Sequence, residues 1–236
     1  MSKYVVEITS DDDVGQRIDN FLLGRLKGVP RQHIYKILRS GEVRVNSGRV
    51  KPTYRLALAD KVRIPPVRTR EEAPIRAQEG LINRLMAAII YQDDDYLALN
   101  KPPGIAVHGG SSISSGLVEQ LRIALDNPRL ELVHRLDRDT SGCLLLSKRA
   151  AALRLAQAEF RARSVSKIYT AIVHGQWPVR KRVLQERLER FKTSSGERRV
   201  RVSHLGQSAR TDVEVVATAG SVTRLRIRLH TGRTHQ

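Results

Sequence analysis

Along the first quarter of the chain, apolar residues recur at every second position and then at the spacing of a helix. The alternation over residues 1–10 predicts a strand, and the three- and four-residue spacing over residues 16–26 and 31–39 predicts two amphipathic helices. Short apolar runs over residues 43–46 and 56–64, bounded by glycine and proline, predict strands after the helices. The pattern indicates a small unit of two helices followed by a β-hairpin.

The rest of the chain mixes strand and helix patterns and predicts a larger α+β unit. Helices are expected over residues 81–88, 117–125 and 150–163. Strands are expected over residues 89–92, 96–100, 130–133, 143–147, 167–173, 209–216 and 223–230. The run at 143–147 is apolar without interruption, which fits a strand buried on both faces, and Cys143 is expected to be a buried small hydrophobe.

The net charge of the chain indicates which class of molecule it binds. The 236 residues carry a net charge of +18, which favours a polyanion, with nucleic acid ahead of membrane lipid. No apolar run approaches the roughly 18–20 residues that a membrane span needs. The N-terminus lacks the apolar core of a signal peptide, and a single cysteine cannot form an internal disulfide. We therefore expect a cytoplasmic protein without a membrane partner.

Half of the charge excess lies in the small unit. Between Arg17 and Arg63, twelve Lys and Arg stand against three Asp and Glu, a balance of +9. Residues 16–64 resemble the S4 domain, an RNA-binding module, through residues 16–22 (Gln-Arg-Ile-Asp-Asn-Phe-Leu) and 39–46 (Arg-Ser-Gly-Glu-Val-Arg-Val-Asn). The resemblance implies contacts with RNA phosphates and with RNA shape. We expect these contacts from Arg17, Arg31, Lys36, Arg39 and Arg44.

A loop between two predicted strands carries the densest chemistry. Its sequence is His134-Arg135-Leu136-Asp137-Arg138-Asp139-Thr140-Ser141-Gly142. A plain connection needs one or two turn residues, whereas this one offers an imidazole, two guanidiniums, two carboxylates and two hydroxyls. Rigid strands on both sides would hold these groups in place, as a catalytic site requires.

The residue types of this loop occur in four kinds of site. Asp137 and Asp139 could form the acid/base pair of a glycosidase, but side chains two residues apart in an extended loop point in opposite directions. A kinase catalytic loop needs His-Arg-Asp with a following Asn, and Leu136 interrupts that order. A metal site would need further ligands at fixed spacing, so none is expected. A single carboxylate nucleophile, flanked by arginine and joined by a tyrosine from a neighbouring strand, stays open.

The nonapeptide is similar to the His-Arg-Leu-Asp-x-x-Thr-Ser-Gly motif of the RluA family of pseudouridine synthases. Three further stretches match the family's motifs in the same order: Asn100-Lys101-Pro102-Pro103-Gly104, Lys167-Ile168-Tyr169 and Gly232-Arg233-Thr234-His235-Gln236. The resemblance extends from about residue 10 to the end of the chain. It implies an α+β protein in which the S4 domain precedes a catalytic domain with a mixed, mostly antiparallel β-sheet and flanking helices.

The family's roles, carried onto the matching positions, make Asp137 the nucleophile and Arg233 its ion-pair partner. Tyr169 would stack on the uracil, and Arg135 would fill the space that the flipped base leaves. The implied substrate is a set of specific uridines in 23S ribosomal RNA of the large subunit. No cofactor is implied, because the isomerisation of uridine to pseudouridine involves no redox change.

The resemblance also suggests a domain plan. The S4 domain is expected over residues 1–66, a linker over 67–80 and the catalytic domain over 81–236 of a monomer. The basic region 180–201 is expected to form a hairpin or loop that contacts RNA phosphates. Because Gln236 lies inside the last motif, we expect a C-terminal truncation. The alternative is a non-catalytic RNA-binding or ribosome-assembly protein that retains the fold.

Overall fold

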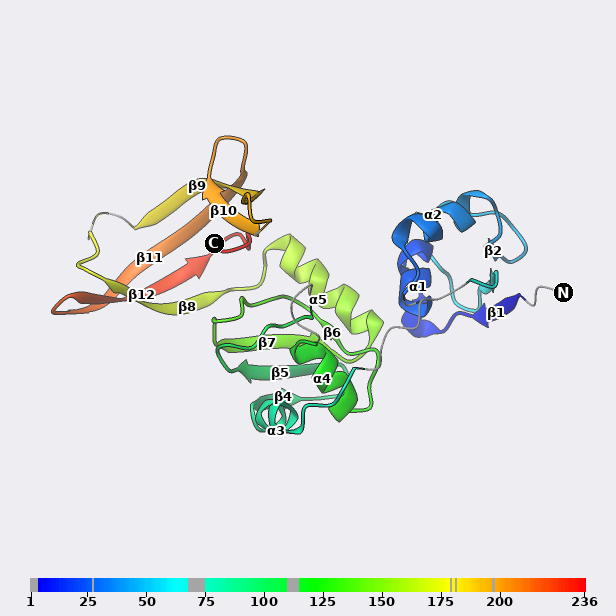
Figure 1. The fold of residues 1–236 in the computed structure, drawn as a ribbon, viewed down its shortest axis with the longest axis horizontal. Coiled ribbons are helices and arrows are strands. Elements are labelled where there is room, and N and C mark those ends of the chain that lie inside the picture. Colours follow the sequence, from blue (N-terminus) through cyan, green and yellow to red (C-terminus); the bar gives the residue numbers. More distant parts are fainter. Residues whose placement is uncertain are drawn as a thin grey trace. The chain divides into compact units, whose positions relative to one another are not determined.

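The computed structural model describes residues 4–26, 28–67, 75–109, 115–178, 180, 182–196 and 198–236 (Figure 1). Two compact units, Met1–Ala156 and Gln157–Gln236, make up the chain. The α+β class expected from the sequence is confirmed, and every strand pairing in the described ranges is antiparallel. Half of the expected linker 67–80, residues 68–74, lies outside the described residues.

The N-terminal part of the first unit packs two helices against one face of a small sheet. Its elements are β1 (Val5–Ile8), a 3-10 turn η1 (Asp11–Asp13), α1 (Ile18–Arg25), α2 (Arg31–Arg39), β2 (Arg44–Val45) and β3 (Lys61–Ile64). The helices and the inner face of the sheet share one core of fully buried aliphatic residues, among them Leu22, Ile34 and Val62. Gly41, at a φ of 76°, ends α2 in the left-handed conformation that favours glycine. The predicted helices are therefore confirmed.

The strands of this domain differ from a simple hairpin. β2 pairs with β3, but the sheet order is β1-β3-β2, so the N-terminal strand completes the sheet. A long segment, residues 46–60, connects β2 to β3, and the buried carboxylate of Asp60 organises it. Asp60 accepts hydrogen bonds from Asn46 Nδ2 at 2.7 Å, from Tyr54 Oη at 3.0 Å and from the backbone N–H of Ala57 at 2.9 Å. Burial alone would raise the pKa of Asp60, but these donors outweigh it and lower the pKa.

The remainder of the first unit builds a four-stranded sheet with helices beside it (Figure 1). Its elements are α3 (Glu79–Ala87), β4 (Ile89–Gln92), β5 (Tyr96–Lys101), α4 (Leu117–Ala124), β6 (Glu131–Leu132) and β7 (Gly142–Ser147). The helix α5 (Ala150–Ala162) begins in this unit and ends in the second. The strands lie in the order β4-β5-β7-β6. This order places the end of β5, where the Pro102-Pro103 turn starts, beside the first residue of β7. The loop over residues 134–142, called the central loop below, ends at that residue.

The expected burial of Cys143 is wrong, because its side chain is exposed. Leu144 and Leu146 on one face of β7 are fully buried, as are their cross-strand partners Leu99 and Leu97. Cys143 and the partly buried Leu145 alternate onto the opposite face, which is less completely covered. An uninterrupted apolar run therefore did not mean equal burial on both faces.

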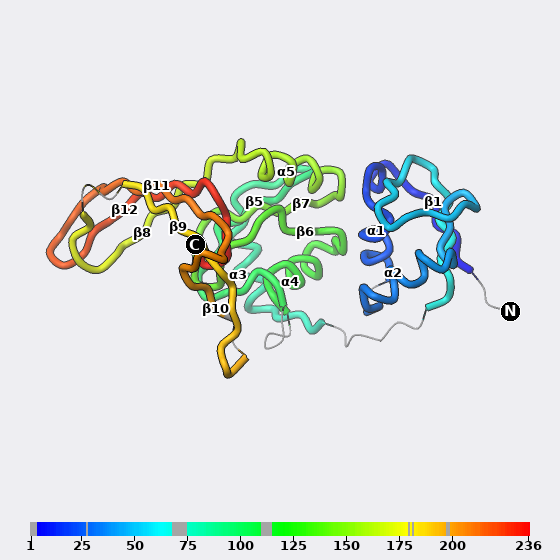
Figure 2. The backbone as a smooth tube through the Cα atoms, turned by 90° about the horizontal axis from the view of Figure 1, so that it is seen from above, coloured from blue at the N-terminus to red at the C-terminus, as the bar shows by residue number. Residues whose placement is uncertain are grey.

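The second unit is a five-stranded antiparallel sheet (Figure 2). Its strands are β8 (Ile168–His174), β9 (Val183–Lys192), β10 (Arg198–Val202), β11 (Gln207–Ala219) and β12 (Val222–Leu229), in the order β10-β9-β11-β12-β8. The basic region at 180–201 thus contains the paired strands β9 and β10, which confirms the expected hairpin. In the described parts of both units, no helix is long and apolar enough to cross a membrane.

Candidate active site

The loop that carries Asp137 connects β6 to β7, and hydrogen bonds from Lys101 hold it in place. Lys101 is the last residue of β5 and is fully buried. Its Nζ donates hydrogen bonds to the carbonyl oxygens of Pro102, Arg138 and Thr140 at 2.9, 2.9 and 2.8 Å. Two of these acceptors, the carbonyls of Arg138 and Thr140, follow Asp137 in the loop. The three donors of one ammonium group thus join the end of β5 to the central loop.

Burial of Lys101 disfavours its charged form, and two nearby carboxylates oppose this effect only in part. Burial removes water from the ammonium group and lowers the pKa of Lys101, while the nearby carboxylates of Asp139 and Asp137 act in the opposite direction. In the sheet register Lys101 lies opposite Gly142, which has a φ of 117°. That conformation favours glycine, which accounts for the glycine that ends the loop.

The other side of the loop is held by His134. The backbone N–H of Leu145 donates a 3.1 Å hydrogen bond to His134 Nε2, next to the backbone bond from Val133 to Leu145. The imidazole therefore continues the pairing of β6 with β7 after the strand itself has ended. Because Nε2 accepts this bond, it carries no proton in this arrangement.

Asp137 itself is accessible from solvent. Its side chain is 41% exposed, whereas the preceding Leu136 is buried and anchors the backbone. The nearest cation to its carboxylate within the first unit is Arg135, whose Nη2 lies 3.9 Å from Oδ1. Asp139 points elsewhere, toward Arg138 at 3.3 Å, and both are largely exposed. The loop thus presents the carboxylate of Asp137 beside the guanidinium of Arg135 on a fixed backbone, an arrangement that suits a nucleophile acting on an anionic polymer.

Tyr169 lies on β8 in the second unit, paired with Ile227 of β12. Along β8 its side is partly buried, whereas Ile168 and Ile172 on the other side are exposed. Tyr169 therefore faces the better-covered side of the sheet, as the alternation predicts. A tyrosine ring on this side could offer a flat surface to a base.

Arg233 follows β12 in a turn that is closed by hydrogen bonds. Its Nε donates to the carbonyl of Ser208 on β11 at 3.0 Å, and its backbone N–H donates to Gln236 Oε1 at 3.0 Å. It lines a pocket of about 190 Å³ together with Glu189 and Thr234. Arg233 is thus bound on the β11 side of β12, and Tyr169 lies on the β8 side.

A histidine–carboxylate pair that the sequence did not reveal lies just before this turn. His230 Nε2 and Asp212 Oδ2 are 2.7 Å apart, and Arg210 Nε donates to the same carboxylate at 3.3 Å. The hydrogen bond with His230 is the main cause that lowers the pKa of Asp212. The pair fixes the end of β12 from which Arg233 is presented. Strand alternation alone gave no sign of it, because the partners are 18 residues apart.

Comparison with known proteins identifies the family. Residues 95–236 match the family described as RNA pseudouridylate synthase, and residues 16–62 match the S4 domain. The chain belongs to the RNA pseudouridylate synthase family. The resemblance expected from the four motifs is therefore confirmed, and with it the assignment to the isomerases.

Relatives in this family cover most of the chain. It is 49% identical to ribosomal large subunit pseudouridine synthase C of Pasteurella multocida, over 96% of this chain and 71% of that protein. The protein of the same description from Escherichia coli K12 is also 49% identical, over 98% of this chain and 73% of its own. The solved structure of human RNA pseudouridylate synthase domain containing 4 superposes with a TM-score of 0.53 at 28% identity, over 66% of this chain and 64% of that one.

For a pseudouridylate synthase, the division of the predicted catalytic residues between the units matters. Asp137 and Arg135 belong to the first unit, and Tyr169 and Arg233 to the second. The meeting of Asp137 with Tyr169 and Arg233 is a prediction from the order of the family's motifs. In the first unit, sequence reasoning missed the role of Lys101. It stands in the first motif, but its spacing from the central loop gave no signal that the two touch.

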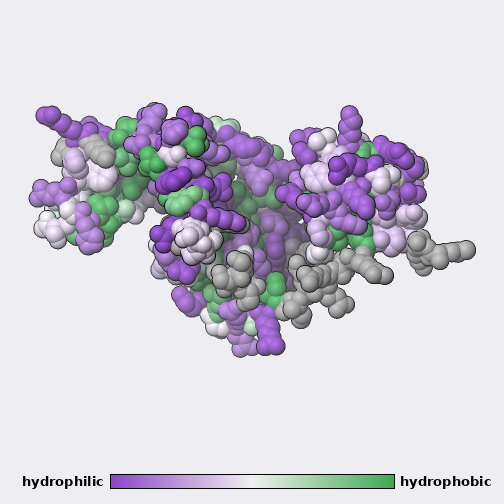
Figure 3. Space-filling view, turned by 45° about the horizontal axis from the view of Figure 1, so that its top comes forward, coloured by the Kyte–Doolittle hydropathy of each residue, from purple (hydrophilic) through white to green (hydrophobic). Residues whose placement is uncertain are grey.

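The S4 residues expected to bind RNA fall into two groups. Arg31, Lys36 and Arg39 are exposed on α2, where Arg31 and Arg39 flank Tyr35 in a shallow groove. Figure 3 shows hydrophilic residues over much of the visible surface of this N-terminal domain, at the right of the view. The cations of α2 are thus free to meet a polyanion from solvent.

The second group, Arg17 and Arg44, forms hydrogen bonds with neighbouring groups of the same domain. Arg17 donates from Nε and Nη2 to the buried carboxylate of Asp19 at 3.1 and 2.6 Å. Burial would raise the pKa of Asp19, but the hydrogen bonds from Arg17 and Tyr35 outweigh it and lower the pKa. Arg44 donates from Nε to the carbonyl of Gly41 and from Nη1 to that of Ser47. Both arginines stabilise local structure, and their expected contact with RNA stays a prediction.

Proposed function

We propose that this protein isomerises specific uridines of 23S large-subunit ribosomal RNA to pseudouridine, with Asp137 as the nucleophile. The names of its 49% identical relatives support the substrate. The observation that carries the site is the accessible carboxylate of Asp137, on a loop that Lys101 and His134 hold at both sides. A fixed and accessible carboxylate is what covalent catalysis by an aspartate requires.

The proposed reaction exchanges one bond of the nucleoside for another. The bond between N1 and C1′ breaks, the uracil rotates, and C5 bonds to C1′. The proton on C5 leaves and N1 gains a proton, so the product has the same atoms as the substrate. Attack of Asp137 on C1′ of the ribose or on C6 of the uracil leads to this result.

The other site residues are assigned by their position in the family's motifs. Arg233 would pair with the carboxylate of Asp137 and keep it ionised. Tyr169 would stack on the uracil, a role that its place on the better-covered side of β8 supports. Arg135 is exposed beside Asp137 and would occupy the space of the flipped base. With Arg135→Ala, turnover should fall far more on folded rRNA than on a single-stranded substrate. Equal losses would contradict this role.

The decisive experiment compares Asp137→Asn with Asp139→Asn on a 23S rRNA transcript. Both changes remove one negative charge from the same loop, but only the first removes the proposed nucleophile. Pseudouridine formation should vanish with Asp137→Asn and stay within about threefold of wild type with Asp139→Asn, since exposed carboxylates contribute little elsewhere. Formation of pseudouridine by Asp137→Asn at the wild-type rate would exclude Asp137 as the nucleophile. Absence of pseudouridine with the wild type as well would leave the non-catalytic RNA-binding alternative.

The assembly is proposed on the same basis. The protein would act on the RNA as one cytoplasmic monomer. It would consist of an S4 domain over 1–66, a linker over 67–80 and a catalytic domain over 81–236. The exposed cations of α2 and of the hairpin β9–β10 would hold the phosphates. Size-exclusion chromatography with light scattering checks the oligomeric state, and a mass near 26.6 kDa is expected.

A further inference from the structure

The small sheet of the S4 domain has an outer face that no helix of this domain covers. In the register of β1 with β3, Val6 lies opposite Arg63 and Ile8 opposite Lys61. Arg44 of β2 lies opposite Arg63 from the other side. These side chains point away from α1 and α2, because the alternating residues Val45, Val62 and Ile64 are buried in the shared core.

The outer face is apolar along β1. Val6 and Ile8 are exposed large aliphatic residues, and Tyr4 just before the strand is exposed as well. Exposed aliphatic residues are ordinary when they occur singly, but here they share one side of one strand. Such a strip on a soluble domain calls for a partner.

Beside this strip lies a ring stacked on a guanidinium. The Cζ atom of Arg63 lies 4.4 Å from the centroid of the Tyr4 ring. Arg63 Nη2 donates a long bond of 3.4 Å to the carbonyl of Glu42, and its Nε is buried without a hydrogen-bond partner among the described residues. The guanidinium of Arg63 is thus held mainly by the Tyr4 ring, and it can donate further hydrogen bonds.

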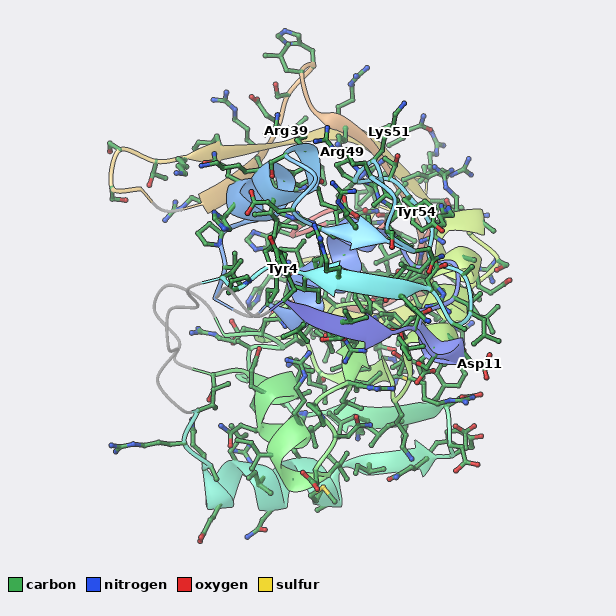
Figure 4. The ribbon with its side chains drawn as sticks, turned by 90° about the vertical axis from the view of Figure 1, so that its right-hand side faces the viewer. Tyr4, Asp11, Arg39, Arg49, Lys51 and Tyr54 are labelled. Carbon is green, nitrogen blue, oxygen red and sulfur yellow. The ribbon has the colours of Figure 1, made fainter. Side chains whose placement is uncertain are left out.

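The charges on this face are positive. Lys61 and Arg63 on β3 and Arg44 on β2 stand beside the apolar strip, and Figure 4 places Arg49 and Lys51 beyond β2. The one carboxylate of β1, Glu7, turns to the inner side and pairs with Arg25 of α1 at 3.0 Å. Figure 4 shows Asp11 past the far end of β1, away from Tyr4.

We propose that this outer face binds unpaired nucleotides of the RNA substrate. An aromatic ring and aliphatic side chains that contact bases, next to cations that contact phosphates, are the features with which proteins hold single-stranded RNA. The face lies across the domain from the exposed side of α2, because the core separates the two. The S4 domain would therefore contact RNA on two sides. This inference rests on the proposed function, since it takes the same RNA as its ligand.

A protein partner fits this face less well. Apolar docking surfaces between proteins are depleted of charge at their centre, and Lys is disfavoured there. Here Lys61 lies directly opposite Ile8 of β1. Charge complementarity therefore favours a polyanion over a second protein surface.

The test uses the full chain in an Asp137→Asn background, so that binding is measured without turnover. Ile8→Glu places a carboxylate on the outer face, and Ile90→Glu makes the identical change on β4, where exposure is 62% against 64% for Ile8. We expect Ile8→Glu to weaken binding of a 23S rRNA transcript about tenfold and Ile90→Glu less than twofold. Equal effects of the two variants would overturn the proposal.

A second pair of variants guards against a folding defect in Ile8→Glu. Tyr4→Phe keeps the stacked ring, whereas Tyr4→Ala removes it, and Tyr4 lies outside the core. Binding should be retained by Tyr4→Phe and should weaken about fivefold with Tyr4→Ala, within the range of base stacking. Photo-crosslinking of 4-thiouridine in the transcript to Tyr4 should give a peptide–RNA adduct. The proposal would be refuted if Tyr4→Ala retained its affinity and the protein with Tyr4 gave no adduct. This outcome is independent of the Asp137 experiment.

Discussion

Lys101 Nζ donates a 2.8 Å hydrogen bond to the carbonyl oxygen of Thr140, three residues beyond Asp137. The backbone N–H of the same Thr140 donates back to the carbonyl of Asp137 at 3.1 Å. The loop is therefore closed by its own turn and tied by that turn to the end of β5. A carboxylate that must reach one atom of a substrate gains from such fixation, because misplacement by about 1 Å can cost 100-fold in rate.

Replacing Lys101 with methionine should therefore affect both stability and turnover. The variant leaves the carbonyls of Pro102, Arg138 and Thr140 without their donor. We expect a loss of about 3 kcal/mol in the free energy of unfolding and a fall in kcat of about 100-fold. Thermal melting and single-turnover kinetics measure the two effects.

The matched control is Lys148→Met. Its Nζ donates to a single carbonyl, that of Asp93, at the β4–β5 turn and outside the catalytic loop. This variant should lose less than about 1 kcal/mol and keep its kcat. If Lys101→Met also kept its kcat, the position of the loop would not depend on Lys101.

His134 offers a separate test of the same loop. His134→Gln can still accept the N–H of Leu145 through its side-chain oxygen, whereas His134→Ala cannot. We expect His134→Ala to lower kcat about tenfold and His134→Gln to restore most of it, with KM little changed in both, since the loss of one buried hydrogen bond costs about 1–3 kcal/mol. Equal activity of the two variants would show that the imidazole does not hold the loop.

Most of the fold followed from periodicity. The predicted helix at 31–39 coincides with α2 (Arg31–Arg39), and the central strand at 143–147 with β7 (Gly142–Ser147). These segments have strong patterns and clear end signals, such as Ser40-Gly41 after α2. Local pattern decides the element type here because each element buries one apolar face.

What the sequence did not predict depends on contacts between distant residues. The bond from Lys101 to Thr140 spans 39 positions, and the pairing of β1 with β3 spans more than 50. Cys143 was misjudged for a related reason, since burial depends on what covers each side of the sheet. Asp137 was found as a candidate because its chemistry is local to one loop.

The buried carboxylate of Asp60 predicts a pH dependence of stability. Its pKa is lowered in the folded state, so its contribution is fully present above the unfolded value of about 3.9 and is lost as pH falls through the lower folded value. Asp60→Asn should therefore lower the melting temperature at pH 7 and flatten its decline below about pH 4. Asp94→Asn on the exposed β4–β5 turn is the control. Parallel melting curves of wild type and Asp60→Asn between pH 7 and pH 3 would contradict the assignment.

The cations of α2 predict a salt dependence of RNA binding. Arg31 and Arg39 are exposed on one side of the helix and flank Tyr35. Each phosphate contact makes the slope of log K against log salt more negative by about 0.7–0.9. Arg31→Ala and Arg39→Ala should therefore each make the slope less negative by about that amount. Arg149→Ala is the matched control, because its guanidinium is already paired with Asp95. Filter binding between 50 and 300 mM KCl on a 23S rRNA transcript measures the slopes. An unchanged slope in both α2 variants would mean that RNA does not meet this side of the helix.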